Sequence, residues 1–216
     1  ALEHYLSVVG EYIDIILFGD DLGMQGGPQM SPAMYEEFFK PRHARMWHRA
    51  KELANVKVML HCCGGVQPLL RHLIEAGLDS LRVSLNSAQE RYYTGYYRPN
   101  GYAFADVLSS IRLMKSVGRF VSLNYFILPG LSDSVPEFEA LCSLVASCRP
   151  DMIQLRNLNM DPEWYLKTIG LPRDEKKMGI SPWLKALKKE FPALRFGYFN
   201  PLLATAEQAV IGGNRC

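Results

Sequence analysis

Residues 55–87, NVKVMLHCCGGVQPLLRHLIEAGLDSLRVSLNS, decide the fold. Two short apolar runs, Val56 to His61 and Ser80 to Leu85, flank a helical segment whose end lies near Leu73 to Asp79. Most of the β-rich runs in the chain are apolar for four or more residues without clean alternation, which is typical of strands that are covered on both faces. The stretch therefore predicts two parallel strands joined by a crossover helix.

The same alternation continues on both sides of this stretch. Four further β-rich runs are present: Ile13 to Phe18, Phe120 to Leu128, Met152 to Leu158 and Leu194 to Phe199. Helix starts are expected between them, at Ser31 followed by Pro32 and at Ser134, which has capping-box spacing to Glu137. Strand–helix alternation over six units indicates an α/β fold, either a partial (βα) TIM-like barrel with about six parallel strands or an open doubly wound sheet. Because no Gly-x-Gly-x-x-Gly follows a strand, we favour the barrel.

Composition limits the class of protein. The chain of 216 residues is 48% hydrophobic with a formal net charge of +2, so we expect one domain, residues 1–216, and no nucleic-acid partner. No run approaches the roughly 20 apolar residues of a membrane helix, and we expect no membrane partner and a cytoplasmic location. The five cysteines lack the spacing of a disulfide scaffold, so reduced thiols or metal ligands are expected.

Chemistry in barrels belongs at the carboxyl ends of the strands. The first strand runs into the glycine-rich loop of residues 19–28, where Asp20 and Asp21 are candidate catalytic residues. Two carboxylates at a strand end could bind polar groups of a substrate, bind a cation or exchange a proton. The alternative is a turn capped by an aspartate.

The second strand ends in His61, Cys62, Cys63 and two glycines. Because side chains alternate along a strand, His61 and Cys63 point to one face and form a candidate zinc pair. A third ligand is not visible in the sequence: Cys142 lies on the apolar stripe of a helix and is expected to be a core thiol, and Cys148 and Cys216 could contribute only if the fold brings them near. The alternative is a partly buried histidine beside inert thiols.

Polar residues also mark the ends of the next three strands. Alternation places Ser84 with Asn86, Ser122 with Asn124, and Gln154 with Arg156. Such a ring suits a polar ligand that carries a carboxylate and ribose hydroxyls, although the same groups could simply hydrogen-bond one another. The tyrosine-rich segment 92–102 is expected to be a long loop that forms a lid or a partner surface, or packs.

The motifs GDDLGMQGGPQMSP, KPRHARMW and LHCCGGVQPLLRHLIEAGLD, within residues 5–78, resemble the uroporphyrinogen decarboxylase superfamily, and more closely its zinc-dependent cobamide methyltransferases. The resemblance implies a zinc ion on His61 and Cys63, with Asp20 or Asp21 near the substrate. Zinc-assisted methyl transfer or porphyrinogen decarboxylation is the activity that it implies.

From about residue 74 to 216, the motifs GLDSLRVSLNSAQERYYTGYYRPNGY, FVSLNYFILPGLSD and MIQLRNLNMDPEWYL resemble the later strands of radical S-adenosylmethionine enzymes. The resemblance implies that Ser84, Asn86, Asn124 and Arg156 line an S-adenosylmethionine pocket. No Cys-x-x-x-Cys-x-x-Cys occurs in the sequence, so we expect no iron–sulfur cluster. We interpret the chain as a chimera whose segments, 1–78 and 79–216, meet near Leu73 to Asp79.

Three functions follow from these observations. The first is an enzyme of the decarboxylase and methyltransferase superfamily that acts on a small-molecule substrate. The second is a radical-enzyme-like barrel that binds S-adenosylmethionine without cleaving it, and the third is a folded but inactive scaffold. An open sheet edge could also support a homodimer.

Overall fold

The computed structural model describes residues 1–62, 64–158, 160–172 and 176–198. A parallel sheet holds six strands in the order β1 (Ile15–Gly19), β4 (Lys57–His61), β5 (Ser80–Leu85), β6 (Phe120–Ile127), β7 (Met152–Asn157) and β8 (Arg195–Tyr198). The order follows the chain without a reversal, as in a barrel and unlike a doubly wound sheet. The predicted α/β fold, a partial TIM-like barrel of parallel strands, is confirmed.

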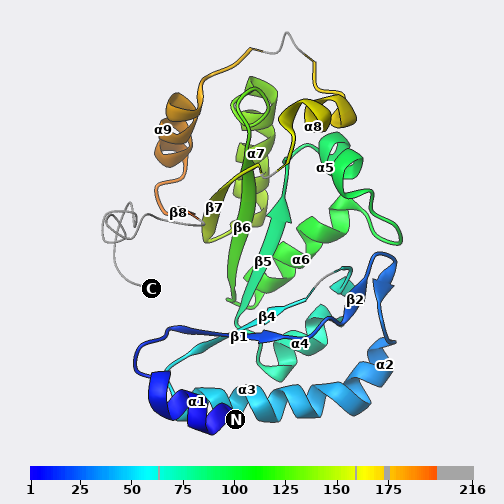
Figure 1. Ribbon diagram of the computed structural model, residues 1–216, viewed down its shortest axis with the longest axis vertical. Helices are drawn as coiled ribbons and strands as arrows, with labels where there is room; N and C mark the ends of the chain where they lie inside the picture. The colour runs from blue at the N-terminus through cyan, green and yellow to red at the C-terminus, as the bar shows by residue number, and fades with distance from the viewer. Residues whose placement is uncertain (63, 159, 173–175, 199–216) are drawn as a thin grey trace. The chain divides into compact units, whose positions relative to one another are not determined.

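Helices connect these strands (Figure 1). They are α1 (Leu2–Val9), α2 (Pro32–Met34), α3 (Lys40–Leu53), α4 (Leu70–Ala76), α5 (Glu90–Tyr97), α6 (Phe104–Ser116), α7 (Val135–Cys148), α8 (Pro162–Ile169) and α9 (Ile180–Glu190). A π-helical turn, Tyr35–Phe39, joins α2 to α3, and a 3-10 turn, Gln67–Leu69, precedes α4. A short antiparallel hairpin, β2 (Gly23–Met24) and β3 (Gly27–Pro28), follows β1. No helix in these described ranges is both long and apolar enough to cross a membrane.

The chain divides into two compact units. Unit 1 comprises residues 1–81 and 99–120, and the described part of unit 2 comprises residues 82–98 and 121–198. The division does not test the expectation of one domain with segments 1–78 and 79–216, which stays a prediction.

Unit 1 packs α3 against β1 and β4 (Figure 1). The buried stripe of α3, His43, Trp47 and Ala50, recurs at helical spacing, and the ring of Trp47 lies 6.4 Å from that of Phe18 on β1. Asp79, just before β5, ties this unit together: its carboxylate accepts hydrogen bonds from the Val58 amide at 2.9 Å and from Arg119 at 2.8 Å. Lys51 lies 2.7 Å from the same carboxylate.

Unit 2 packs α7 against β6. The predicted N-cap is confirmed, because the Ser134 hydroxyl accepts a hydrogen bond from the amide of Glu137. The capping box suggested by the spacing does not form. The Glu137 side chain accepts a hydrogen bond from the hydroxyl of Ser87, and the Ser134 amide donates to the carbonyl of Leu131. Cys148 is the fully buried thiol of α7, whereas Cys142, expected in the core, is only partly buried.

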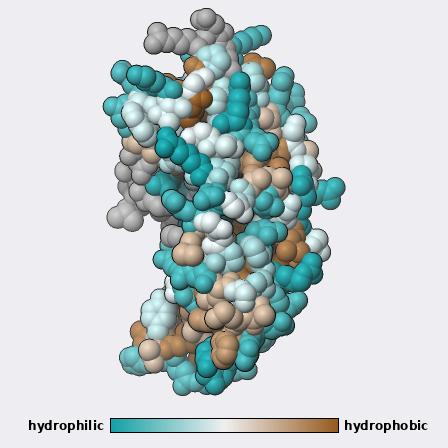
Figure 2. Space-filling view, turned by 90° about the vertical axis from the view of Figure 1, so that its right-hand side faces the viewer, coloured by the Kyte–Doolittle hydropathy of each residue, from teal (hydrophilic) through white to brown (hydrophobic). Residues whose placement is uncertain are grey.

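Strand β1 is an edge of the sheet, and its two faces differ. Ile16 is buried, whereas Ile15 and Leu17 are exposed. On the face of the molecule shown in Figure 2, apolar residues likewise come to the surface in separate patches among hydrophilic ones. The homodimer expected at an open edge stays a prediction.

Candidate functional site

One face of the sheet in unit 2 carries polar side chains. The Asn124 amide on β6 donates a hydrogen bond of 3.4 Å to the hydroxyl of Ser84 on β5. Phe126, two residues further along β6, pairs in register with Arg156 on β7, whose guanidinium lies 5.7 Å from the centre of the phenyl ring. Because side chains two residues apart on a strand share a face, Ser84, Asn124 and Arg156 lie on one side of the sheet.

Asn86, the fourth residue predicted to bind the cofactor, lies just beyond the end of β5 and is 0% exposed. Its amide group donates hydrogen bonds to the carbonyl of Tyr92 at 2.8 Å and to the hydroxyl of Tyr165 at 2.9 Å. Burial raises the pKa of Tyr165 to about 12, so this phenol stays protonated at neutral pH. The ring of Tyr96 contacts both Tyr165 and Phe126 edge-on, so aromatic rings link Asn86 to the side of the sheet that holds Arg156.

These tyrosines correct one expectation. The segment 92–102 was predicted to be a long loop, but residues 90–97 form helix α5, which packs against α8. Tyr92 and Tyr93 are buried in unit 2. The burial of aromatic side chains therefore outweighs the turn-like composition of the segment.

Two buried oxygens of this site lack a hydrogen-bond partner within the described ranges. They are Oδ1 of Asn86 and Oδ1 of Asn124. Leaving a buried acceptor unpaired costs about 1 to 3 kcal/mol, so such atoms in a folded protein call for an explanation, such as a bound group. Both oxygens could accept hydrogen bonds from a ligand that brings donors.

The polar strand ends of unit 1 form a separate arrangement around Asp20. One oxygen of its half-exposed carboxylate lies 3.1 Å from Nε2 of His43, and Nδ1 of His43 lies 2.8 Å from the Tyr35 hydroxyl. Burial lowers the pKa of His43, although the hydrogen bond to Asp20 opposes the shift, and burial also raises the pKa of Tyr35. A neutral His43 satisfies this chain of contacts by donating to Asp20 and accepting from Tyr35. Sequence reasoning named Asp20 but missed His43 and Tyr35, which show no spacing signal.

Asp21, the second predicted catalytic residue, is exposed in the loop after β1, and its backbone carbonyl accepts a hydrogen bond from Gln29. The structure therefore places the Asp20 carboxylate beside a buried titratable partner, His43.

His61 is exposed at the end of β4, and its backbone carbonyl accepts a hydrogen bond from the Asp20 amide. Cys63, the other half of the predicted zinc pair, lies outside the described residues. Within the ranges that the structure describes, no group of three or more His, Cys, Asp or Glu side chains could hold a metal ion. The zinc pair stays a prediction.

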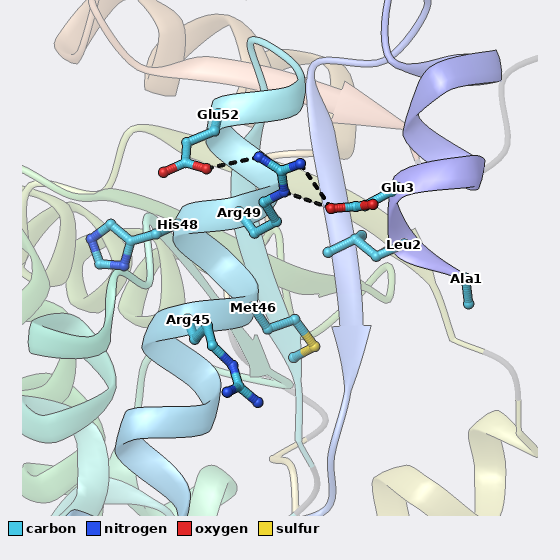
Figure 3. Close-up of a pocket in the computed structure, with 8 residues that line it drawn as sticks. All are labelled: Ala1, Leu2, Glu3, Arg45, Met46, His48, Arg49 and Glu52. Atoms are coloured by element: carbon cyan, nitrogen blue, oxygen red, sulfur yellow. Dashed lines mark hydrogen bonds and ion pairs between the residues drawn. The ribbon is translucent and has the colours of Figure 1, made fainter.

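A hollow of about 600 Å³ lies between α1 and α3 of unit 1 (Figure 3). Arg49 crosses it and forms ion pairs with Glu3 at 2.8 Å and Glu52 at 3.1 Å. None of the predicted site residues lines it, and Arg49, Glu3 and Glu52 pair with one another at the surface. The hollow is therefore not our candidate site.

Comparison with known proteins identifies the family. The profile of the radical SAM superfamily matches residues 6–142, which is more than half of the chain. The chain therefore belongs to the radical SAM superfamily. No curated protein matches the sequence.

Two solved structures agree on the fold. Methylornithine synthase has 16% identity and a TM-score of 0.56, with 91% of this chain and 53% of that chain covered. A domain of pyruvate-formate lyase-activating enzyme from Bacteroides vulgatus ATCC 8482 has 10% identity and a TM-score of 0.51, with 86% and 99% covered. The chain thus spans about half the length of methylornithine synthase, and identities this low show the fold alone.

The radical SAM resemblance is confirmed, and it also reaches into the first third of the chain. No comparison supports the resemblance of residues 5–78 to the uroporphyrinogen decarboxylase superfamily, nor the methyltransferase activity or the chimera. The expectation of no iron–sulfur cluster is wrong, because the family implies both S-adenosylmethionine and such a cluster. That expectation rested on one missing cysteine motif, which is a weaker observation than a match over most of the fold.

The described residues fit the two implied groups differently. The unpaired oxygens of Asn86 and Asn124 fit a ligand rich in hydrogen-bond donors, as S-adenosylmethionine is. Iron–sulfur clusters are held by several thiolates, and in the part of the chain described here no metal-ligating set of three gathers. The described residues therefore do not by themselves supply the ligand set of a cluster.

Proposed function

We propose that the polar face of unit 2 binds S-adenosylmethionine, and that the protein is an enzyme of the radical SAM class acting on a small-molecule substrate. The observation that carries the proposal is the pair of buried amide oxygens, on Asn86 and Asn124, that lack a partner within the described ranges. Membership of the superfamily supports the choice of ligand.

The chemistry of the ligand matches the side chains. S-adenosylmethionine carries an ammonium group, ribose hydroxyls and an adenine amino group, all of which can donate hydrogen bonds to amide oxygens. It also carries a carboxylate, which a guanidinium recognises well, and Arg156 places a guanidinium on this face. Ser84, exposed on β5, adds a hydroxyl that can both donate and accept.

The roles of the side chains follow from these contacts. S-adenosylmethionine, when bound, would supply the radical chemistry of the class on receiving one electron from a reduced iron–sulfur cluster, so that this chemistry belongs to the cofactors and not to the protein. Asn86 and Asn124 would orient the ligand, and Arg156 would neutralise its carboxylate. The rings of Tyr96, Tyr165 and Phe126 would exclude water from one side.

Calorimetric titration of the whole chain with S-adenosylmethionine tests the proposal. Replacement of Asn124 by alanine should weaken binding by about tenfold, because it removes one well-placed acceptor. Asn55→Ala is the matched control, since Asn55 is exposed in unit 1 and should leave the affinity unchanged. No heat of binding at millimolar ligand, or equal affinities for the two variants, would rule the proposal out.

A further inference from the structure

Glu137, near the start of α7, is 0% exposed. Four donors surround its carboxyl group. One oxygen accepts from the Ala88 amide and the Tyr125 hydroxyl, both at 2.6 Å. The other accepts from the hydroxyl of Ser87 at 2.6 Å and the side-chain amide of Gln89 at 2.9 Å. A buried carboxyl group is tolerated only when its hydrogen bonds are satisfied, so this network strongly specifies the positions of its donors.

Two of these donors lie next to the asparagines of the proposed site in the sequence. Ser87 directly follows Asn86, and Tyr125 directly follows Asn124. Successive side chains on a strand point to opposite faces, so Tyr125 reaches Glu137 on the side of β6 away from Asn124. Glu137 therefore bonds to the residues that follow both asparagines whose oxygens lack partners: to Ser87 and Ala88 after Asn86 and, on the face of β6 away from Asn124, to Tyr125.

We propose that Glu137 is a positioning residue for S-adenosylmethionine, which fixes the spacing between the side-chain oxygens of Asn86 and Asn124 without touching the ligand. The inference rests on the proposed function of this face. A binding site needs its contacting groups held to about half an ångström by the residues behind them. Glu137 bonds to both segments, through the Ser87 hydroxyl and the Ala88 amide on one and through the Tyr125 hydroxyl on the other.

The first test compares two buried carboxylates of unit 2 in the whole chain. Glu137→Gln keeps the shape of the side chain, but its single oxygen cannot serve four donors. We expect the affinity for S-adenosylmethionine in calorimetry to fall by about tenfold. Asp133→Asn is the matched control, because Asp133 is also buried and accepts from the amides of Gly130 and Gly179, neither of which adjoins an asparagine of the site. Its affinity should stay within about twofold of the wild type.

The second test reads the geometry without any ligand. In ¹H–¹⁵N spectra of the free protein, the side-chain amide signals of Asn86 and Asn124 should shift in Glu137→Gln and stay in place in Asp133→Asn. Two smaller substitutions should each shift the signal of one asparagine, a pattern that a general loss of stability would not produce. Tyr125→Phe should move mainly the Asn124 signal, and Ser87→Ala mainly the Asn86 signal.

The outcomes separate the two proposals. If the wild type shows no binding of S-adenosylmethionine, the proposed function fails, and the amide shifts alone still decide whether Glu137 sets the two positions. Unshifted asparagine signals in Glu137→Gln, or a loss of affinity no greater than in Asp133→Asn, would overturn the inference. If Glu137→Gln does not fold, the opposite patterns expected of Tyr125→Phe and Ser87→Ala decide it.

Discussion

Replacing Asp79 with alanine should destabilise unit 1 more than any change to a surface ion pair. The carboxylate is 9% exposed and bonds to three groups: the buried amide of Val58, the ammonium of Lys51 and the guanidinium of Arg119. Together these contacts hold the start of β5 to β4, to α3 and to the segment after α6.

The loss of unfolding free energy expected for Asp79→Ala follows from how deeply each partner of the carboxylate is buried. An unsatisfied buried amide at Val58 costs about 1 to 3 kcal/mol. Lys51 and Arg119 are about one-third exposed, so the loss of each charge partner lies between the roughly 0 to 1 kcal/mol of a surface pair and the 3 to 5 kcal/mol of a buried one. Lys51 keeps a hydrogen bond to the Gly77 carbonyl, which limits its share. The free energy of unfolding should therefore fall by about 3 to 5 kcal/mol.

Urea unfolding, followed by tryptophan fluorescence and circular dichroism, measures this change, because Trp47 reports on unit 1 and Trp183 on unit 2. Glu52→Ala is the control, since Glu52 forms an exposed pair with Arg49 and should cost less than about 1 kcal/mol. The loss of unfolding free energy in Asp79→Asn should lie between those of Asp79→Ala and Glu52→Ala, because asparagine keeps an acceptor for the Val58 amide but loses the charge. An Asp79→Ala variant within 1 kcal/mol of the control would refute the reasoning.

Two further predictions concern unit 1. Because burial lowers the pKa of His43, the unfolded chain binds more protons than the folded chain just below the ordinary histidine pKa of about 6.5. In thermal unfolding, the contribution of His43 to stability should be fully present above that pH and should be lost as the pH falls through the pKa of His43 in the folded state. If the pH dependence of the melting temperature is the same in His43→Gln as in the wild type, the prediction is wrong. Gly64→Ala should cost about 2 kcal/mol or more, since its backbone is left-handed and a Cβ would lie 2.6 Å from the Met24 backbone. Gly118→Ala, equally left-handed but in open space, should cost only about 1 kcal/mol, and equal losses in the two melts would show that the contact with Met24 does not matter.

Much of the fold was predictable because its signals are local. Each of the six expected runs overlaps a strand of the sheet. Ser31, predicted as a cap from the proline that follows it, and Ser134, predicted from its spacing to Glu137, both cap helices. The aromatic segment was misread, because its tyrosines are buried by α8, a helix about 70 residues further along the chain.

The candidate site was predictable only in part. Alternation grouped residues within each strand, since the two-residue period of a strand can be read from the sequence, but only the contacts and register between strands show that Ser84, Asn124 and Arg156 share one face. The role of Glu137 could not be read in this way. Its position three residues after Ser134 suggested a capping box, and only the packing of α7 on β6 and on the turn after β5 shows where the carboxyl group bonds instead.

The sequence by itself determined the order of strands and helices, the parallel α/β class and the resemblance to radical S-adenosylmethionine enzymes, because periodicity, caps and motifs act over a few residues. The tertiary structure alone decided which polar groups meet. Asp20 with His43, and Glu137 with Ser87, are separated by 23 and 50 residues, and their contacts depend on how whole elements pack. The same packing leaves the oxygens of Asn86 and Asn124 buried without partners within the described ranges, which no local pattern could have predicted.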